Sequence, residues 1–315
     1  MAEWVLYGLM GIPLICGVLA LLTKSERLRG VIVTLSAIAV AAGGLTLVWQ
    51  SLQNSAPGKI WSLTAPVQAG WIGCGLELVI IAIIFGVALK IKNFWIAVFG
   101  MIQFALAIGV NFVGGHSEET ELVLFKIDNL TRIMLLVTCL VGATILIFAI
   151  GYMKEHAKHA PPTAGSNGRF FFYFISFLGF MVGLVCSNNL SFFSFFWEAT
   201  TLCSYALIGQ DGGEARRVNA VRALLINSFG GVLLLAGIFL LKWKTGGESF
   251  ETILANKSIT LLPAVLLCVA AFTKSALFPF QSWLLGAMVA PTPVSAMLHA
   301  ATMVKAGVYL VMRIT

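Results

Sequence analysis

The chain alternates between long apolar stretches and short polar breaks. A helix needs about 20 mostly apolar residues to cross a bilayer, and ten stretches meet this condition. The breaks contain charges or turn formers, as in Lys24-Ser25-Glu26-Arg27 and in Ser187-Asn188-Asn189, which is short enough to predict a helical hairpin. The pattern predicts ten membrane spans, over residues 4–22, 28–50, 71–89, 93–113, 129–152, 170–187, 190–209, 223–241, 261–285 and 293–312.

Composition supports this interpretation. Hydrophobic residues make up 59% of the 315 residues and charged residues only 10%, against about 25% charged in soluble domains. A soluble globular domain and a disordered chain are both excluded, because each needs far more charge. A β-barrel would show short alternating segments instead of long apolar runs. The expected fold class is an all-α polytopic membrane protein.

The distribution of basic residues predicts an orientation. The formal net charge of +7 comes from scattered Lys and Arg residues without a stripe that would suit nucleic acid. When the ten spans alternate sides, one side receives eleven basic residues and the other only Lys59, Lys242, Lys244 and Lys257, with the acidic stretch Glu118-Glu119-Thr120-Glu121. Because cytoplasmic loops are enriched in Lys and Arg, the sequence predicts a multi-pass protein of the cell (inner) membrane with its N-terminus outside.

The sequence lacks the patterns of a bond-making active site. It shows no nucleophile–base set, phosphate loop or metal-ligand spacing, and its six cysteines form no CxxC pair and lie in or beside apolar runs. Such cysteines are typical small buried hydrophobes. We expect no cofactor and no metal in this chain.

Four ionisable residues lie at membrane depth in three spans: Glu198, Lys274, His299 and Lys305. Charge in hydrocarbon is costly, so such residues usually serve transport. A lysine beside a carboxylate keeps its proton and releases it when the carboxylate is neutralised, and a histidine exchanges protons near neutral pH. The four residues are the predicted proton-translocation set.

Two further acids have alternative interpretations. Glu77, in the span 71–89, is either an ion-pair partner at a subunit contact or a secondary transport residue. Asp128 lies with Lys126 and Arg132 at a span boundary, where an interfacial ion-pair cluster is the main expectation and a transport role is the alternative.

Prolines flank the junction of the last two spans. Pro279, Pro291 and Pro293 each remove a backbone donor, with Gly286 and Gly307 nearby. Broken membrane helices often mark ion sites, because the freed backbone lines a cavity. The alternative is a simple kink, but the proximity to Lys274 and His299 favours a functional break.

The same region holds a run of short motifs: Lys274-Ser275-Ala276, Phe278-Pro279, Trp283-Leu284, Ala290-Pro291-Thr292-Pro293-Val294-Ser295-Ala296, His299-Ala300-Ala301-Thr302-Met303-Val304 and Ala306-Gly307-Val308-Tyr309-Leu310. Earlier come Trp197-Glu198, Leu202-Cys203-Ser204-Tyr205 and Leu207-Ile208-Gly209. Over residues 120–315 the chain resembles the antiporter-like subunits shared by respiratory complex I, Mrp-type cation/proton antiporters and energy-converting membrane-bound hydrogenases.

The resemblance implies roles for the four residues. In that family a glutamate like Glu198 pairs with a lysine like Lys274, the proton carrier of the input half-channel. A histidine like His299 or a lysine like Lys305 comes next on the broken helix. The presence of both indicates a hydrogenase-type or Mrp-type relative.

Three features depart from the family pattern. The stretch Asn227-Ser228-Phe229-Gly230-Gly231-Val232 lacks the acid that some relatives carry there. Residues 1–120 hold four spans where complex I would have about two, so we expect an extra hairpin. Residues 121–315 form one antiporter-like repeat, and a second repeat is absent from this chain. The expectation is a fragment, a split gene product or half of a two-chain subunit.

Three functions follow as hypotheses. The first is a non-catalytic, proton- or sodium-translocating subunit of a membrane-bound redox complex, either a complex I-like NADH:quinone oxidoreductase or an energy-converting hydrogenase. Its partners would be other membrane subunits, which would hold the iron–sulfur clusters, nickel–iron site, flavin or quinone. The second is an Mrp-type monovalent cation/proton antiporter subunit. The third is a structural fragment without transport.

Overall fold

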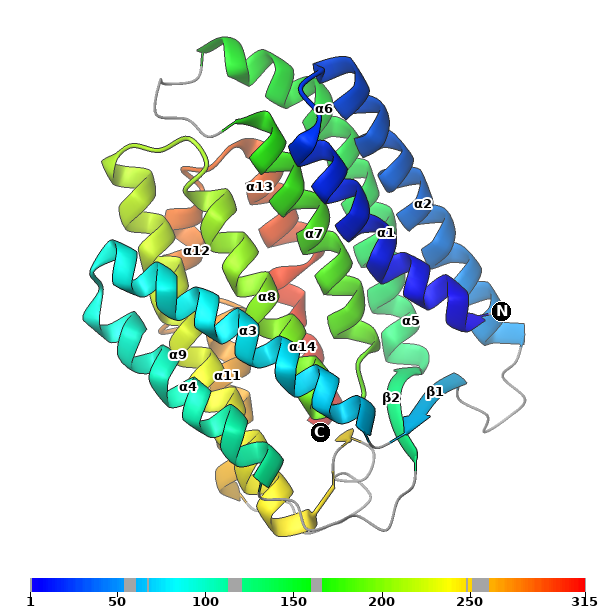
Figure 1. Ribbon diagram of the computed structural model, residues 1–315, viewed down its shortest axis with the longest axis vertical. Coiled ribbons are helices and arrows are strands. Elements are labelled where there is room, and N and C mark those ends of the chain that lie inside the picture. The colour runs from blue at the N-terminus through cyan, green and yellow to red at the C-terminus, as the bar shows by residue number, and fades with distance from the viewer. Residues whose placement is uncertain are drawn as a thin grey trace.

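The computed structural model describes residues 2–53, 61–66, 68–112, 121–159, 166–247, 249–250 and 261–314. These residues form a bundle of long helices with one small two-stranded sheet at its end (Figure 1). Seven helical segments are long and apolar enough to cross a membrane, and two shorter apolar helices lie among them. The predicted class, a helical polytopic membrane protein, is confirmed.

Each predicted span falls on helix. The first four correspond to α1 (Ala2–Leu22), α2 (Glu26–Gln53), α3 (Gln68–Ile91) and α4 (Phe94–Phe112). The fifth is one continuous helical segment made of α5 (Asn129–Leu136), the π-helical turn η1 (Val137–Val141) and α6 (Gly142–His159). Next come α7 (Asn167–Cys186), α8 (Leu190–Ile208) and α9 (Glu214–Thr245).

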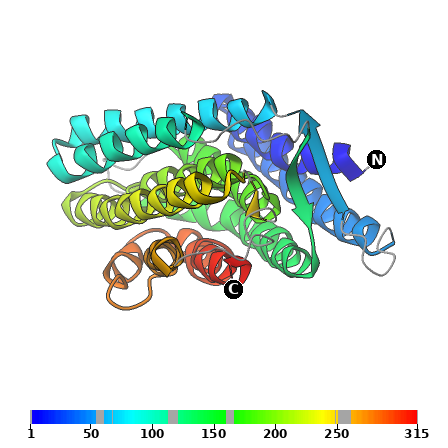
Figure 2. The ribbon, with the colours of Figure 1, turned by 90° about the horizontal axis from the view of Figure 1, so that it is seen from below.

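The last two spans are interrupted, unlike the others. The stretch 261–285 divides into α11 (Leu261–Lys274) and α12 (Ser282–Ala287). The stretch 293–312 divides into α13 (Thr292–Ala296), the π-helical turn η2 (Met297–Ala301) and α14 (Met303–Ile314). Helix α12 packs against α9, α13 against α6 and α14 against α7, and these interrupted segments lie on the face of the bundle opposite α3 and α4 (Figure 2).

The core is centred on α7 and α8. Most of the α7 span is buried, at 78% of its apolar window, whereas only 28% of the α1 window is. Aromatic side chains fill this centre, among them Phe174, Phe177, Phe193 and Trp197. The outer helices instead expose Leu, Ile and Trp side chains, as a surface in contact with lipid does.

The predicted hairpin between α7 and α8 is tight. The Asn189 side chain accepts hydrogen bonds from the backbone amides of Ser191 and Phe192, at 3.0 and 3.2 Å. It thereby caps the first turn of α8. The backbone amide of Asn188 donates to the Leu124 carbonyl at 2.8 Å, which ties this hairpin to the sheet.

The sheet was not anticipated from the sequence. Strand β1 (Trp61–Pro66) pairs antiparallel with β2 (Glu121–Ile127), with Trp61 opposite Ile127 and Pro66 opposite Glu121. That two of the four N-terminal spans are extra relative to the family pattern stays a prediction. Helices α3 and α4 come between the two strands in the chain and form a helical hairpin inserted between them. It packs against α8 and α9 and covers one side of the bundle (Figure 2).

The basic residues expected on one side lie at the α1–α2, α3–α4, α6–α7 and α8–α9 connections, which share one end of the bundle (Figure 1). Lys242 and Lys244 lie at the opposite end of α9. Lys59, Lys257, Glu118 and Glu119 fall outside the described residues. The cytoplasmic assignment of the basic end stays a prediction.

Close packing of α7 on α8 generates a first testable prediction. A Cβ atom on Gly183 would lie 2.4 Å from the Phe196 ring. We expect Gly183→Ala to lower the free energy of unfolding by about 1–3 kcal/mol, the usual cost of overpacking. Thermal unfolding of the detergent-purified protein measures it. Gly75→Ala is the matched control, because that Cβ meets nothing within 4 Å. Equal melting temperatures for the two variants would contradict the packing.

Candidate functional site

A buried polar cluster lies between α3, α4, α8, α9 and α11. Its central side chains are Glu77, Gln103, Glu198 and Lys274, all at most 1% exposed. Of the residues singled out from the sequence, the structure therefore brings together Glu77, Glu198 and Lys274. His299 and Lys305 lie outside this cluster.

Lys274 is the last residue of α11, and its ammonium group is held by α8. Nζ donates hydrogen bonds to the Trp197 carbonyl and to the Thr201 hydroxyl, each at 2.8 Å. It also lies 4.8 Å from the centroid of the Trp197 ring. The partial negative charge at a helix C-terminus adds to these contacts. Neutral acceptors and a π face thus solvate the buried cation.

Glu198 is held by a glutamine from the inserted hairpin. Gln103 Nε2 donates to Glu198 Oε1 at 3.2 Å and to the Ser228 carbonyl at 2.9 Å. This amide therefore joins α4, α8 and α9. Glu198 and Lys274 interact electrostatically, but within the described chain no ion pair or hydrogen bond joins them directly.

Two glycines in α9 make room for these groups. A Cβ on Gly231 would lie 1.9 Å from Glu198 Oε1 and 2.2 Å from Gln103 Nε2. A Cβ on Gly230 would lie 1.9 Å from the Thr273 hydroxyl. No other residue type fits without movement, so the pair allows α9 to approach both α8 and α11.

Glu77 extends the cluster along α8. Its carboxyl group lies beside Ser194, one helical turn before Glu198, and interacts electrostatically with Glu198. Several buried oxygens of the cluster have no hydrogen-bond partner among the described residues: Glu77 Oε1, Gln103 Oε1, Glu198 Oε2 and Ser228 Oγ. Buried oxygens need a proton, a water molecule or a cation to be stable, so this cluster is suited to ion chemistry.

The break after Lys274 is stabilised by side chains. The Thr273 carbonyl, freed by the end of α11, accepts a hydrogen bond from Trp283 Nε1 at 2.8 Å. The Ser275 hydroxyl donates to the Val304 carbonyl at 2.7 Å, which joins the break to α14. A Cβ on Gly307 would lie 2.2 Å from the Ala271 carbonyl oxygen, so Gly307 permits this close approach. Pro279 lies in the connecting segment between α11 and α12.

The second break contains the predicted histidine. Pro291 caps α13, and Pro293 is in its first turn. His299 lies in η2, half-buried beside the Leu284 carbonyl. The Thr302 hydroxyl donates to the Met297 carbonyl at 2.7 Å, at the end of this π-helical turn. Lys305 projects from α14 and is exposed.

Asp128 lies at the sheet end of the bundle. It caps α5 by accepting from the Thr131 amide at 2.9 Å, and it forms an ion pair with Arg313. Burial alone would raise the pKa of the Asp128 carboxyl, but Arg313 and the Thr131 amide hold that pKa below its ordinary value. The carboxylate stays ionised near neutral pH, which favours the interfacial ion-pair interpretation.

Metal-binding groups are sparse in the part of the chain that is described. No group of three or more His, Cys, Asp or Glu side chains there is arranged to hold a metal ion. The six cysteines are free thiols, and four of them are buried.

Interrupted helices beside a buried carboxylate–lysine cluster define a multi-pass membrane protein of antiporter-like architecture. Comparison with known proteins agrees. Residues 187–315 match the model of the NADH:quinone oxidoreductase/Mrp antiporter membrane family, and residues 122–161 match that of the complex I chain 5 N-terminus. The chain belongs to the antiporter-like membrane subunit family of complex I and Mrp antiporters.

Two relatives with known names are antiporter subunits. The chain is 37% identical over 256 residues to a Na(+)/H(+) antiporter subunit of Alkalihalophilus pseudofirmus, a match over 79% of this chain and 29% of that protein. It is 38% identical over 198 residues to a putative antiporter subunit mnhA2 of Staphylococcus epidermidis, over 60% of this chain and 24% of that protein. The matched region thus spans less than a third of these relatives.

Solved structures show the same architecture. A chain of the Mrp complex from Dietzia sp. DQ12-45-1b matches 98% of this chain, and 27% of that chain is covered, with a TM-score of 0.67 at 27% identity. A chain of the archaeal membrane-bound sulfane sulfur reductase matches 99% of this chain, with 41% of that chain covered and a TM-score of 0.67. At 18% identity the second match concerns the fold alone.

Three members of the cluster were missed from the sequence: Gln103, Thr201 and Gly231. Gln103 carried a usable signal, since it is a polar residue in the middle of the span 93–113. Charge at membrane depth does not identify it, because its amide is neutral. Thr201 and Gly231 carried no such signal, because hydroxyls and glycines are common in membrane helices.

The contact between Lys274 and Thr201 can be tested by a double-mutant cycle. Thr201→Val should lower the free energy of unfolding by roughly 1–3 kcal/mol, because a buried ammonium loses an acceptor. In a Lys274→Met background the same change should cost clearly less, since no ammonium remains. Denaturant unfolding of the four purified proteins measures both. Additive effects would contradict the contact.

Proposed function

We propose that this chain is an antiporter-like subunit of an Mrp-type monovalent cation/proton antiporter, and that Glu198 and Lys274 carry its proton step. The observation that carries the proposal is the fully buried Glu198–Gln103–Lys274 cluster beside an interrupted helix. The sequence placed a redox complex first. The names of the relatives support the antiporter alternative over that first hypothesis.

The contacts suggest how the proton is held and released. Two neutral acceptors and an aromatic ring hold the Lys274 ammonium, so its charge is stabilised without a direct carboxylate contact. The negative charge of Glu198 adds an electrostatic attraction that disappears when Glu198 takes up a proton or a metal cation. Protonation of Glu198 would then promote release of the Lys274 proton.

From Lys274 the proton would move to the second interrupted helix, between α13 and α14. His299, in η2, carries an imidazole that can both accept and donate a proton, and Lys305 follows on α14. Lys305 is exposed, so it would pass the proton to a neighbouring protein element. Glu77 would act as a second carboxylate that shares a proton or cation with Glu198. Its carboxyl group lies beside Ser194, one helical turn before Glu198 on α8.

A redox-driven complex remains the second candidate. The family model that matches residues 187–315 includes NADH:quinone oxidoreductase as well as Mrp antiporters, and this match motivates it. A secondary antiporter exchanges Na⁺ for H⁺ in the absence of any electron donor, whereas a redox-driven pump needs one. The assay below therefore omits electron donors.

Charge removal tests the site. Glu198→Gln and Lys274→Ala should each reduce Na⁺-dependent proton exchange at least tenfold, because the two charges no longer control each other's proton. The exchange is measured as the Na⁺-induced collapse of an imposed pH gradient in liposomes that contain the whole purified antiporter complex. Glu214→Gln and Lys90→Ala are matched controls, since both side chains are exposed at the basic end.

Two results decide this test. Normal exchange by Lys274→Ala in fully assembled complex would overturn the proposed role and favour a structural subunit. Exchange that is absent in this assay and appears only when an electron donor is added would favour the redox-driven candidate.

Gly231 offers an independent prediction. Gly231→Ala introduces no charge change but forces Glu198 and Gln103 apart. We expect at least tenfold slower exchange with normal assembly, measured in the same liposomes and by the yield of complex. Gly86→Ala, whose Cβ meets nothing within 4 Å, serves as control. Wild-type exchange in Gly231→Ala would show that the geometry around Glu198 does not matter.

A further inference from the structure

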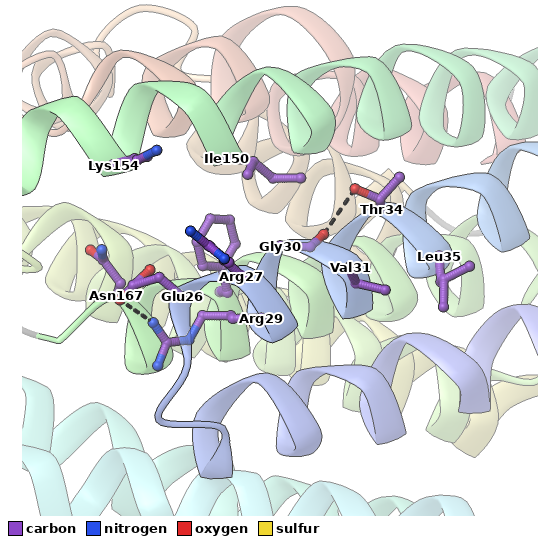
Figure 3. Close-up of a pocket in the computed structure, with 11 residues that line it drawn as sticks. Glu26, Arg27, Arg29, Gly30, Val31, Thr34, Leu35, Ile150, Lys154 and Asn167 are labelled. Atoms are coloured by element: carbon purple, nitrogen blue, oxygen red, sulfur yellow. Dashed lines mark hydrogen bonds and ion pairs between the residues drawn. The ribbon is translucent and has the colours of Figure 1, made fainter.

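A groove of about 460 Å³ opens between α2, α6 and α7 at the basic end of the bundle (Figure 3). None of its lining residues belongs to the buried polar cluster. Its mouth is polar and includes Arg27, Lys154 and Asn167. Its walls are apolar and include Val31, Leu35 and Ile150. The groove therefore changes from charged to hydrocarbon-like along its length.

The basic side chains at the mouth differ in whether they can bind a ligand. Arg29 is buried, and it donates to the Ala20 carbonyl at 3.1 Å and to the Thr23 carbonyl, and pairs with Glu26. It serves the α1–α2 connection. Arg27 and Lys154 are exposed, and no ion pair or hydrogen bond engages either one within the described ranges. They project from α2 and α6 into the same space (Figure 3).

The depth of the groove matches a membrane interface. α2 begins at Glu26 and α6 ends at His159, so the mouth lies where two spans leave the bilayer. Val31 and Leu35 lie one and two turns further along α2, and they are 53% and 59% exposed. A ligand that fits both parts needs an anionic head and an apolar tail.

We propose that this groove binds an anionic phospholipid. Arg27 and Lys154 hold the phosphate, and the Asn167 side chain adds hydrogen-bonding capacity beside it. An acyl chain lies along Val31, Leu35 and Ile150. Basic pockets between membrane helices on the cytoplasmic side are suited to anionic headgroups, and the basic end of this bundle is the predicted cytoplasmic end. The bound lipid would join α2 to α6 and α7.

The test compares phosphatidylglycerol with phosphatidylcholine. Each lipid is titrated into the delipidated whole complex in detergent, and native mass spectrometry measures its binding. We expect Arg27→Gln/Lys154→Gln to weaken phosphatidylglycerol binding by about 30-fold, the effect of two basic groups at a membrane surface, and to leave phosphatidylcholine unchanged. Lys90→Gln/Arg222→Gln removes the same charge elsewhere and should have no effect.

A second pair of variants tests the apolar part. Val31→Trp fills the groove and should weaken phosphatidylglycerol binding, whereas Leu28→Trp, an exposed α2 position outside the groove, should not. Inorganic phosphate at the lipid concentration should not compete. Full competition by phosphate would show a site for a free anion and overturn the lipid assignment. Wild-type binding by Arg27→Gln/Lys154→Gln, or loss of a partner subunit in Val31→Trp without loss of lipid, would overturn it as well.

Discussion

The burial of one lysine inside a hydrocarbon-facing bundle constrains most of this structure. An unpaired ammonium in an apolar medium costs several kcal/mol after relaxation, yet Lys274 is 0% exposed. The bundle solves this by ending α11 at Lys274, so that the negative end of the helix lies at the charge. In addition, the Trp197 carbonyl and the Thr201 hydroxyl of α8 accept hydrogen bonds from the Lys274 ammonium group.

Ending a helix inside the bundle creates a second problem, since its last carbonyls lose their donors. The indole of Trp283 and the backbone amides of residues 275–277 satisfy the carbonyls of residues 271–273. Ser275 then links the break to α14, which Gly307 allows to lie close. The motifs around Lys274 and Gly307 therefore have a structural reason: they make an interrupted helix stable at membrane depth.

The membrane spans and the break near Lys274 could be predicted because they depend on local composition. Apolar length fixes where a helix can cross, and proline and charge mark where it cannot continue. The sheet could not be predicted, because β1 and β2 pair across two intervening helices. The contact of Gln103 with Glu198 joins residues 95 positions apart. Neither contact leaves a periodic signal in the sequence.

The inserted hairpin changes the chemistry of the site and not only its packing. The segment that supplies Glu77 and Gln103 lies between β1 and β2 in the chain, and these two strands pair with each other. One of its residues orients Glu198, and another places a second carboxyl group one helical turn away along α8. Two acids that share one buried region repel each other when both are ionised, so one extra positive charge, a proton or a metal cation, stabilises the pair. Glu198 alone would be balanced by the charge of Lys274, so the additional buried carboxyl group of Glu77 needs one more proton or cation to be stable at this depth.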